Sequence, residues 1–129
     1  MITVAETLDA ICDTKSLKLF EAISVKGLNS EDLSIQLKLS RKEFYSRMSR
    51  LIRLGIVKRK NKKHFLTAFG KIVYDGHITI KKAAENAYML RAIDSMDLSS
   101  DITKYERSKL IESLLDDKKI KEILLRDLS

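Results

Sequence analysis

The spacing of apolar residues predicts short helices in the first 37 residues of the chain. Apolar side chains recur there three or four positions apart, a period that places them on one face of an α-helix. Breaks are expected at Asp13-Thr14 and near Lys26-Gly27, where Gly27 can take the left-handed conformation of a C-cap. We expect helices around Val4, Leu8 and Ile11, around Leu17, Phe20 and Ile23, and, after a cap at Ser30, around Leu33, Ile35 and Leu37.

The next helix has the clearest local signature. Ser40 and Glu43 have the spacing of a capping box, in which each side chain accepts a hydrogen bond from the other residue's backbone N–H. Apolar residues follow at the spacing of a single buried stripe: Phe44, Met48, Leu51 and Ile52. At about 100° per residue, the opposite face is polar or cationic. It holds Lys42, Ser46, Ser49, Arg50 and Arg53, with Tyr45 and Arg47 on its flanks.

A two-stranded hairpin is predicted around Asn61. Apolar positions 56–57 and 65–66 flank a polar run without an acidic residue. Such a pattern favours two β-strands and a basic tip that projects into solvent. The cations of this run are Lys58, Arg59, Lys60, Lys62 and Lys63.

The chain after the hairpin is predicted to be helical to its end. One long helix is expected from Thr67 to Met96, followed by an amphipathic tail at 102–128 in which Asp116-Asp117 caps a last helix. Five residues of the long helix form an apolar surface that the first part of the chain cannot cover: Ile80, Ala83, Ala87, Leu90 and Ile93. We expect a second copy of the chain to cover this surface; the alternative is that the tail folds back on it, and both can hold at once.

Composition and charge sharpen this interpretation. The chain has no proline and only four glycines, which favours helices. Residues 38–82 hold 14 Lys or Arg and two acidic residues, a net charge of +12, whereas the segments before and after carry −3 and −2. A positive charge concentrated in one segment indicates a polyanionic partner, because neutralising phosphates releases counterions.

Other classes of protein find little support. No apolar run approaches the length of a membrane span, and no signal peptide is evident, so we expect a cytoplasmic protein. The single cysteine, Cys12, cannot form an internal disulfide and is expected to be a small buried side chain. No nucleophile motif or glycine-rich phosphate loop is present, so we expect no enzyme activity and no cofactor.

The predicted order of elements resembles that of winged helix-turn-helix transcriptional regulators. The resemblance is carried by Leu33 to Gly70, in which Ser40 to Leu54 is similar to the second helix of the pair and Leu51 to Val57 to its exit into the wing. Phe65-Leu66-Thr67-Ala68-Phe69-Gly70-Lys71 resembles the L-T-x-x-G return after the wing. The lack of proline and the abundance of Ile and Lys give an archaeal-like composition.

The resemblance implies a mainly α fold with a small β-wing and two parts. Residues 1–70 would be the winged helix-turn-helix DNA-binding domain, and residues 71–129 the long helix and helical tail used for homodimerisation. The helix Ser40 to Leu54 would enter the major groove of double-stranded DNA. The expected base contacts are Arg41, Lys42, Tyr45, Ser46 and Ser49. The expected phosphate contacts are Arg47, Arg50, Arg53, Lys58, Arg59, Lys60, Lys62 and Lys63.

The sequence raises two further hypotheses. A winged domain that docks into a larger transcription or signalling assembly is the alternative, although the Lys42/Ser46/Ser49 face lacks the apolar residues that docking needs. Asp75-Gly76-His77 resembles the start of a metal site in some metal-sensing repressors, but Tyr88 and Arg91 stand where a second ligand is needed. No metal site is therefore predicted.

Overall fold

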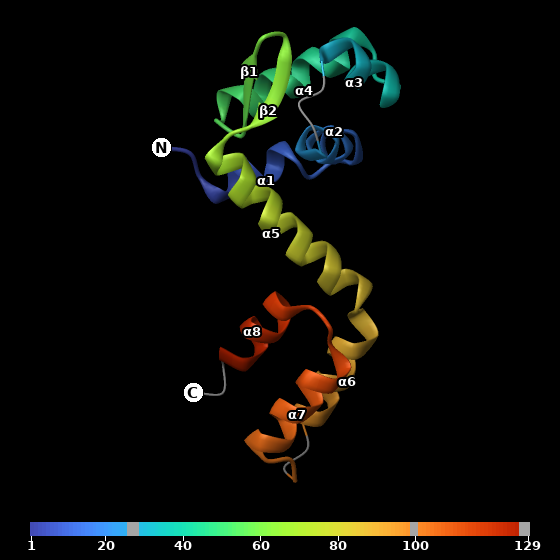
Figure 1. Cartoon of the computed structure of the whole chain (residues 1–129), viewed down its shortest axis with the longest axis vertical. Coiled ribbons are helices and arrows are strands. Elements are labelled where there is room, and N and C mark those ends of the chain that lie inside the picture. Colours follow the sequence, from blue (N-terminus) through green and yellow to red (C-terminus); the bar gives the residue numbers. More distant parts are fainter. Residues whose placement is uncertain (26–28, 99–100, 127–129) are drawn as a thin grey trace. The chain divides into compact units, whose positions relative to one another are not determined.

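The computed structural model describes residues 1–25, 29–98 and 101–126. In these ranges the protein is mainly helical, with a two-stranded antiparallel hairpin (Figure 1). The elements are α1 Val4–Ala10, α2 Thr14–Val25, α3 Ser30–Gln36, α4 Arg41–Arg53, β1 Val57–Lys60, β2 Lys63–Leu66, α5 Ala68–Glu85, α6 Ala87–Asp97, α7 Lys104–Leu114 and α8 Lys118–Arg126. They form two compact units, Met1–Asp75 and Gly76–Ser129. None of the described helices is long and apolar enough to cross a bilayer.

Side-chain caps fix the starts of the helices in the first unit. At α4 the predicted capping box is confirmed, since Ser40 Oγ accepts from the N–H of Glu43 and Glu43 Oε1 accepts from the N–H of Ser40, both at 3.1 Å. At α3 the cap is Asn29, whose Oδ1 accepts from the N–H of Asp32 at 2.9 Å, and not the predicted Ser30. An Asn side chain satisfies an unpaired N–H as well as a serine does. The predicted C-cap at Gly27 lies outside the described residues.

The core of the first unit contains the apolar stripe of α4. Phe44, Met48 and Leu51 are buried as predicted, and they pack with apolar side chains from the other elements of this unit. The fully buried members of this core include Leu19, Phe20, Leu33, Leu51 and Ile56. Ile52, the predicted end of the stripe, is 41% exposed because it lies on the flank of α4 that faces a hollow beside the hairpin.

Of the three apolar residues expected on one face of the first helix, Ile11 is buried and the other two are not. Val4 and Leu8 are exposed, and α1 buries Thr7 and Ala10 instead. Thr7 tolerates burial because its hydroxyl donates to the carbonyl of Thr3 at 2.9 Å. Cys12 is exposed rather than buried as predicted, and its Sγ donates to the carbonyl of Asp9 at 3.3 Å.

The hairpin is a tight two-residue turn between paired strands. Val57 pairs with Leu66, and Lys60 with Lys63, which leaves Asn61 and Lys62 as the loop. Both loop residues have positive φ, 51° and 66°. This is the backbone conformation of a turn whose twist matches that of the flanking strands.

The junction between β2 and α5 shows what Thr67 and Gly70 of the L-T-x-x-G segment do in the fold. Thr67 Oγ1 accepts from the N–H of Gly70 at 2.9 Å and donates to the carbonyls of Gly55 and Ile56, while the Thr67 N–H donates to Ile56 O at 3.1 Å. Thr67 thus caps α5 and ties it to the segment that leaves α4. Gly70 lets α5 approach this segment, since a Cβ there would lie 2.0 Å from Ile56 O.

The helix predicted from Thr67 to Met96 is interrupted at Asn86. This residue stands between α5 and α6, and its side-chain amide donates to the carbonyl of Lys82 at 2.8 Å. The side chain thus competes with backbone hydrogen bonding at this point, as Asn side chains commonly do. The sequence pattern alone did not reveal the break, because the apolar period continues through it.

The C-terminal helices cover most of the predicted apolar surface within the second unit. Ile93 of α6 is buried with Ile111, Leu115 and Ile120 from α7, α8 and the turn between them. Ala83, Leu90, Leu114, Leu124 and Leu125 pack against this core. Of the five residues predicted to form a dimer contact, Ala83, Leu90 and Ile93 are therefore occupied in cis, which leaves Ile80 exposed and Ala87 half-buried.

The start of α8 follows the prediction at Asp117. Its carboxylate accepts from the N–H of Ile120 at 2.9 Å and pairs with Lys82 Nζ at 3.1 Å. These two contacts, led by the backbone hydrogen bond, lower the pKa of Asp117 from its usual value. The C-terminal tail is thus linked to α5 by an ion pair as well as by its apolar face.

Candidate nucleic-acid interface

The outward face of α4 is a polar surface built opposite the core. Because Phe44, Met48 and Leu51 point inward, the side chains half a turn away from them face solvent. The five predicted base contacts, Arg41, Lys42, Tyr45, Ser46 and Ser49, are all exposed, as is Arg53 in the last turn. Arg53 also lies where the negative end of the helix dipole favours a cation.

The hairpin adds five exposed cations. Strand pairing places Lys58, Lys60 and Lys63 on one face, because directly opposed and alternate residues share a face. Arg59 lies on the other face with Val57 and His64, and Lys62 stands in the turn. All five predicted hairpin contacts thus belong to the same unit as α4, but they divide between two faces and a tip.

A hollow of about 190 Å³ separates the hairpin from the near flank of α4. Its lining comes from both elements: Phe44, Tyr45, Met48, Ser49, Ile52, Arg59 and His64. A second hollow, of about 340 Å³, lies between α3 and α4 and is lined by Glu31, Ser34, Arg41, Phe44 and Tyr45. Tyr45 therefore stands at the edge of both hollows, with Arg41 in one and Arg59 in the other.

His64 belongs to β2 of the hairpin and is buried in this region. It is 3% exposed, and its ring lies edge-on to Phe44 with centroids 6.2 Å apart. Burial, and secondarily the positive charge of Arg59, lower the pKa of His64 below its usual value of 6.5. The strand register explains the burial, since His64 shares a face with buried Val57.

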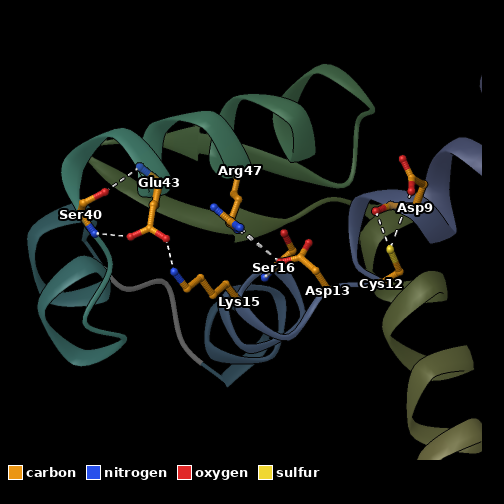
Figure 2. Close-up of polar contacts among 8 residues, drawn as sticks. All are labelled: Asp9, Cys12, Asp13, Lys15, Ser16, Ser40, Glu43 and Arg47. Carbon is orange, nitrogen blue, oxygen red and sulfur yellow. Dashed lines mark hydrogen bonds and ion pairs between the residues drawn. The ribbon is translucent and has the colours of Figure 1, made fainter.

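The far flank of α4 is held by ion pairs to α1 and to the start of α2. Arg47 is directed at Asp13 (Figure 2). Its Nη2 lies 3.3 Å and its Nε 3.4 Å from Asp13 Oδ2. Arg50 forms an ion pair with Asp9. Arg47 and Arg50, two of the predicted phosphate contacts, are thus engaged by carboxylates of the same unit. Arg50 turns to this flank and not to the outward face on which the sequence pattern placed it.

The pKa values of these carboxylates reflect their partners. Hydrogen bonding to Arg50, followed by its charge, lowers the pKa of Asp9. The hydroxyl and backbone N–H of Ser16, together with Arg47, lower the pKa of Asp13, which also caps α2 by accepting from the Ser16 N–H at 3.1 Å. Both carboxylates are therefore charged at neutral pH.

A third ion pair on this flank joins Lys15 of α2 to Glu43 of α4 (Figure 2). Hydrogen bonding to Lys15 and to the Ser40 backbone lowers the pKa of Glu43 to about 2. The capping box of α4 is thereby connected to α2. The sequence indicated Asp13 as a break and cap before the second helix, and the cap is confirmed. It did not indicate the ion pairs of Asp9, Asp13 and Lys15, because their partners are 28 to 41 positions away and no local spacing links them.

No three His, Cys, Asp or Glu side chains among the described residues lie close enough together to hold a metal ion. His77 is half-buried on α5. What the first unit does present is a polar and cationic face on α4, flanked by a cationic hairpin on one side and by neutralised arginines on the other.

Comparison of the chain with protein family models, with curated proteins and with solved structures finds no match.

Proposed function

We propose that the chain is a winged helix-turn-helix transcriptional regulator that binds double-stranded DNA. One observation carries the proposal. The exposed outward face of α4 and the adjoining hairpin hold cations and hydroxyl groups with no carboxylate among them. A helix that presents such a face fits the major groove, where Arg, Lys and Ser side chains can reach base edges.

The arrangement of the first unit supports this proposal. Helices α3 and α4 follow each other through a short turn at Lys38, which has a φ of 54°, and β1 packs beside α4. In the proposal α4 is the recognition helix and the hairpin is the wing. Exposed side chains of its first two turns, Arg41, Lys42, Tyr45 and Ser46, contact bases together with Ser49.

In this proposal the wing contacts the sugar-phosphate backbone of the DNA. Its five cations divide between two faces and a tip, so a duplex meets only part of them at once. With Arg53 and cations of α4 we expect about six neutralised phosphates, so the logarithm of affinity should fall with that of salt concentration with a slope of about −5.

The proposed assembly is a homodimer that places two recognition helices about one DNA turn apart. The described residues retain an exposed apolar set in the second unit that a partner can cover, including Ile80, Tyr88 and Met89. Because Ala83, Leu90 and Ile93 are packed in cis, this set replaces them as the proposed contact. Sedimentation equilibrium tests the dimer: a single species of monomer mass at micromolar concentration would contradict it.

A titration of random-sequence duplex DNA, followed by fluorescence anisotropy at about 50 and 200 mM salt, tests DNA binding. The variant Lys62→Glu plus Lys63→Glu should weaken binding to all sequences, because it reverses two wing charges. A matched control is Lys118→Glu plus Lys119→Glu, an adjacent exposed pair on α8 with the same charge change. Absence of binding at low salt, or equal losses in the two variants, would refute the proposed surface.

Base readout is tested separately by selection from random oligonucleotides. Ser46→Ala removes one hydroxyl from the outward face of α4 and should change the preferred sites with little change in bulk affinity. An unchanged preference would remove Ser46 from the base contacts. If the protein binds an acidic protein but no duplex, it is instead a winged-helix interaction module.

A further inference from the structure

We infer that Asp9 and Asp13 are specificity-determining residues that confine DNA to the hairpin side of α4. They do so by neutralising Arg47 and Arg50, the two cations on the far flank of the helix. This inference rests on the proposed DNA-binding function, and it assigns a role to acidic residues outside the proposed contact surface.

Helix α4 has two flanks that differ in charge. Arg47 and Arg50 lie toward α1 and α2, where their ion pairs with Asp13 and Asp9 are formed. Tyr45 and Ile52 lie on the opposite flank, at the hollow beside the hairpin. The charges of the far flank cancel, whereas those of the outward face and the hairpin do not.

The two carboxylates are more exposed than the arginines with which they pair. The side chain of Asp9 is 64% exposed and that of Asp13 is 47% exposed, more than those of the arginines they hold. A phosphate that approaches this flank therefore meets the carboxylates directly. It gains no net attraction, and it must displace a carboxylate to reach either guanidinium.

Neutralising Arg47 and Arg50 weakens non-specific binding more than specific binding. Affinity for any duplex depends on the number of phosphates neutralised, and each contributes about 0.9 to the slope of log affinity against log salt. Because Arg47 and Arg50 are paired with carboxylates, they do not neutralise phosphates, and binding to random DNA is weaker for that reason. The outward face of α4 is not affected. Sequence-specific binding, which uses that face, keeps its contacts, so the ratio of specific to non-specific affinity rises.

The variant Asp9→Asn plus Asp13→Asn tests the inference. Asparagine keeps the shape of aspartate and remains a good helix cap, so Asp13→Asn preserves the start of α2. We expect affinity for random duplex at about 50 mM salt to rise roughly tenfold, and the salt slope to steepen by up to about 2. Adding Arg47→Gln plus Arg50→Gln to this variant should remove both effects.

The matched control is Asp94→Asn plus Asp116→Asn. Both residues are exposed carboxylates of the second unit, so the net charge changes by the same amount. This control should leave the salt slope unchanged. A rise in slope equal to that of the Asp9/Asp13 variant would show that only net charge matters and would overturn the inference.

A second measurement does not depend on the aspartate variant folding. In the otherwise unaltered protein, Arg47→Gln plus Arg50→Gln should change the salt slope by less than about 0.5, because these arginines are already neutralised. If the salt slope instead became shallower by about 2, the arginines would contact phosphates despite Asp9 and Asp13, and this result would overturn the inference. Failure of the unaltered protein to bind any duplex would instead refute the proposed function itself.

Discussion

Replacing Gly70 with alanine should destabilise the protein through one close approach in the first unit. The added Cβ would lie 2.0 Å from the carbonyl oxygen of Ile56 and 3.3 Å from Leu66 Cδ2. Real Cβ atoms essentially never approach a heavy atom closer than 3.0 Å, so the backbone of α5 or of the segment before β1 must move by about 1 Å. Since the obstacle is backbone, no side chain can rotate away to relieve it.

The size of the effect follows from two opposing terms. Overpacking against a fixed neighbour costs about 3 kcal/mol at the upper end of its usual range. Alanine gains about 1 kcal/mol over glycine in a helix interior, so we expect a net loss of about 2 kcal/mol. In equilibrium urea unfolding of the full chain, followed by circular dichroism, this lowers the midpoint by about 1 to 2 M.

The same helix offers a matched control. Gly76 also lies within α5, but a Cβ added there has no atom within 4 Å. Gly76→Ala should therefore raise stability by about 1 kcal/mol, the helix-propensity term alone. If the two alanine variants differ in stability by less than about 1 kcal/mol, the close approach of α5 to Ile56 is absent and the reasoning fails.

Three further results are expected. Ser40→Ala removes the N-cap of α4 and should cost about 1 kcal/mol in urea unfolding, whereas an unchanged midpoint would mean that the cap is not formed in solution. The pKa of Glu43 falls from 4.5 to about 2 on folding. The charged carboxylate therefore stabilises the folded state fully above pH 4.5, and this stabilisation is lost as the pH falls toward 2. Glu43→Gln should flatten the stability profile in that window, and an identical acid dependence would exclude the Lys15 ion pair. Ile93→Ala should cost about 2 to 5 kcal/mol, and this loss should be the same at every protein concentration because Ile93 is core within one chain; a loss that grows on dilution would place Ile93 at a dimer contact.

The sequence predicted those parts of the fold that depend on local chemistry. Ser40 and Glu43 define the start of α4 by their spacing, and Asp117 caps α8 as expected. The hairpin follows from a polar run between apolar pairs, and its register then determines which cations share a face. These features need only neighbours within a few positions, which a sequence displays directly.

The sequence did not reveal features that depend on distant partners. Arg47 and Arg50 look like free cations on a helical wheel, and only the fold brings Asp13 and Asp9 to them. The covering of Ile93 by α7 and α8 likewise depends on how the tail folds back, and periodicity is the same whether the cover comes from one chain or two. The base contacts proposed for α4 are exposed, as an outward face requires, but exposure is shared by every solvated helix.

In the turn of the hairpin, the residue that would give the most stable backbone conformation is not the residue that carries a positive charge. Asn61 and Lys62 both have positive φ, and the second position of such a turn favours glycine because a side chain there costs about 1 kcal/mol or more. Lysine stands at this position instead. A programme of stabilising substitutions guided by turn chemistry would choose glycine at 62, and it would yield a more stable hairpin that lacks a cation of the proposed DNA surface. At this position a higher melting temperature is therefore a poor guide to retained function.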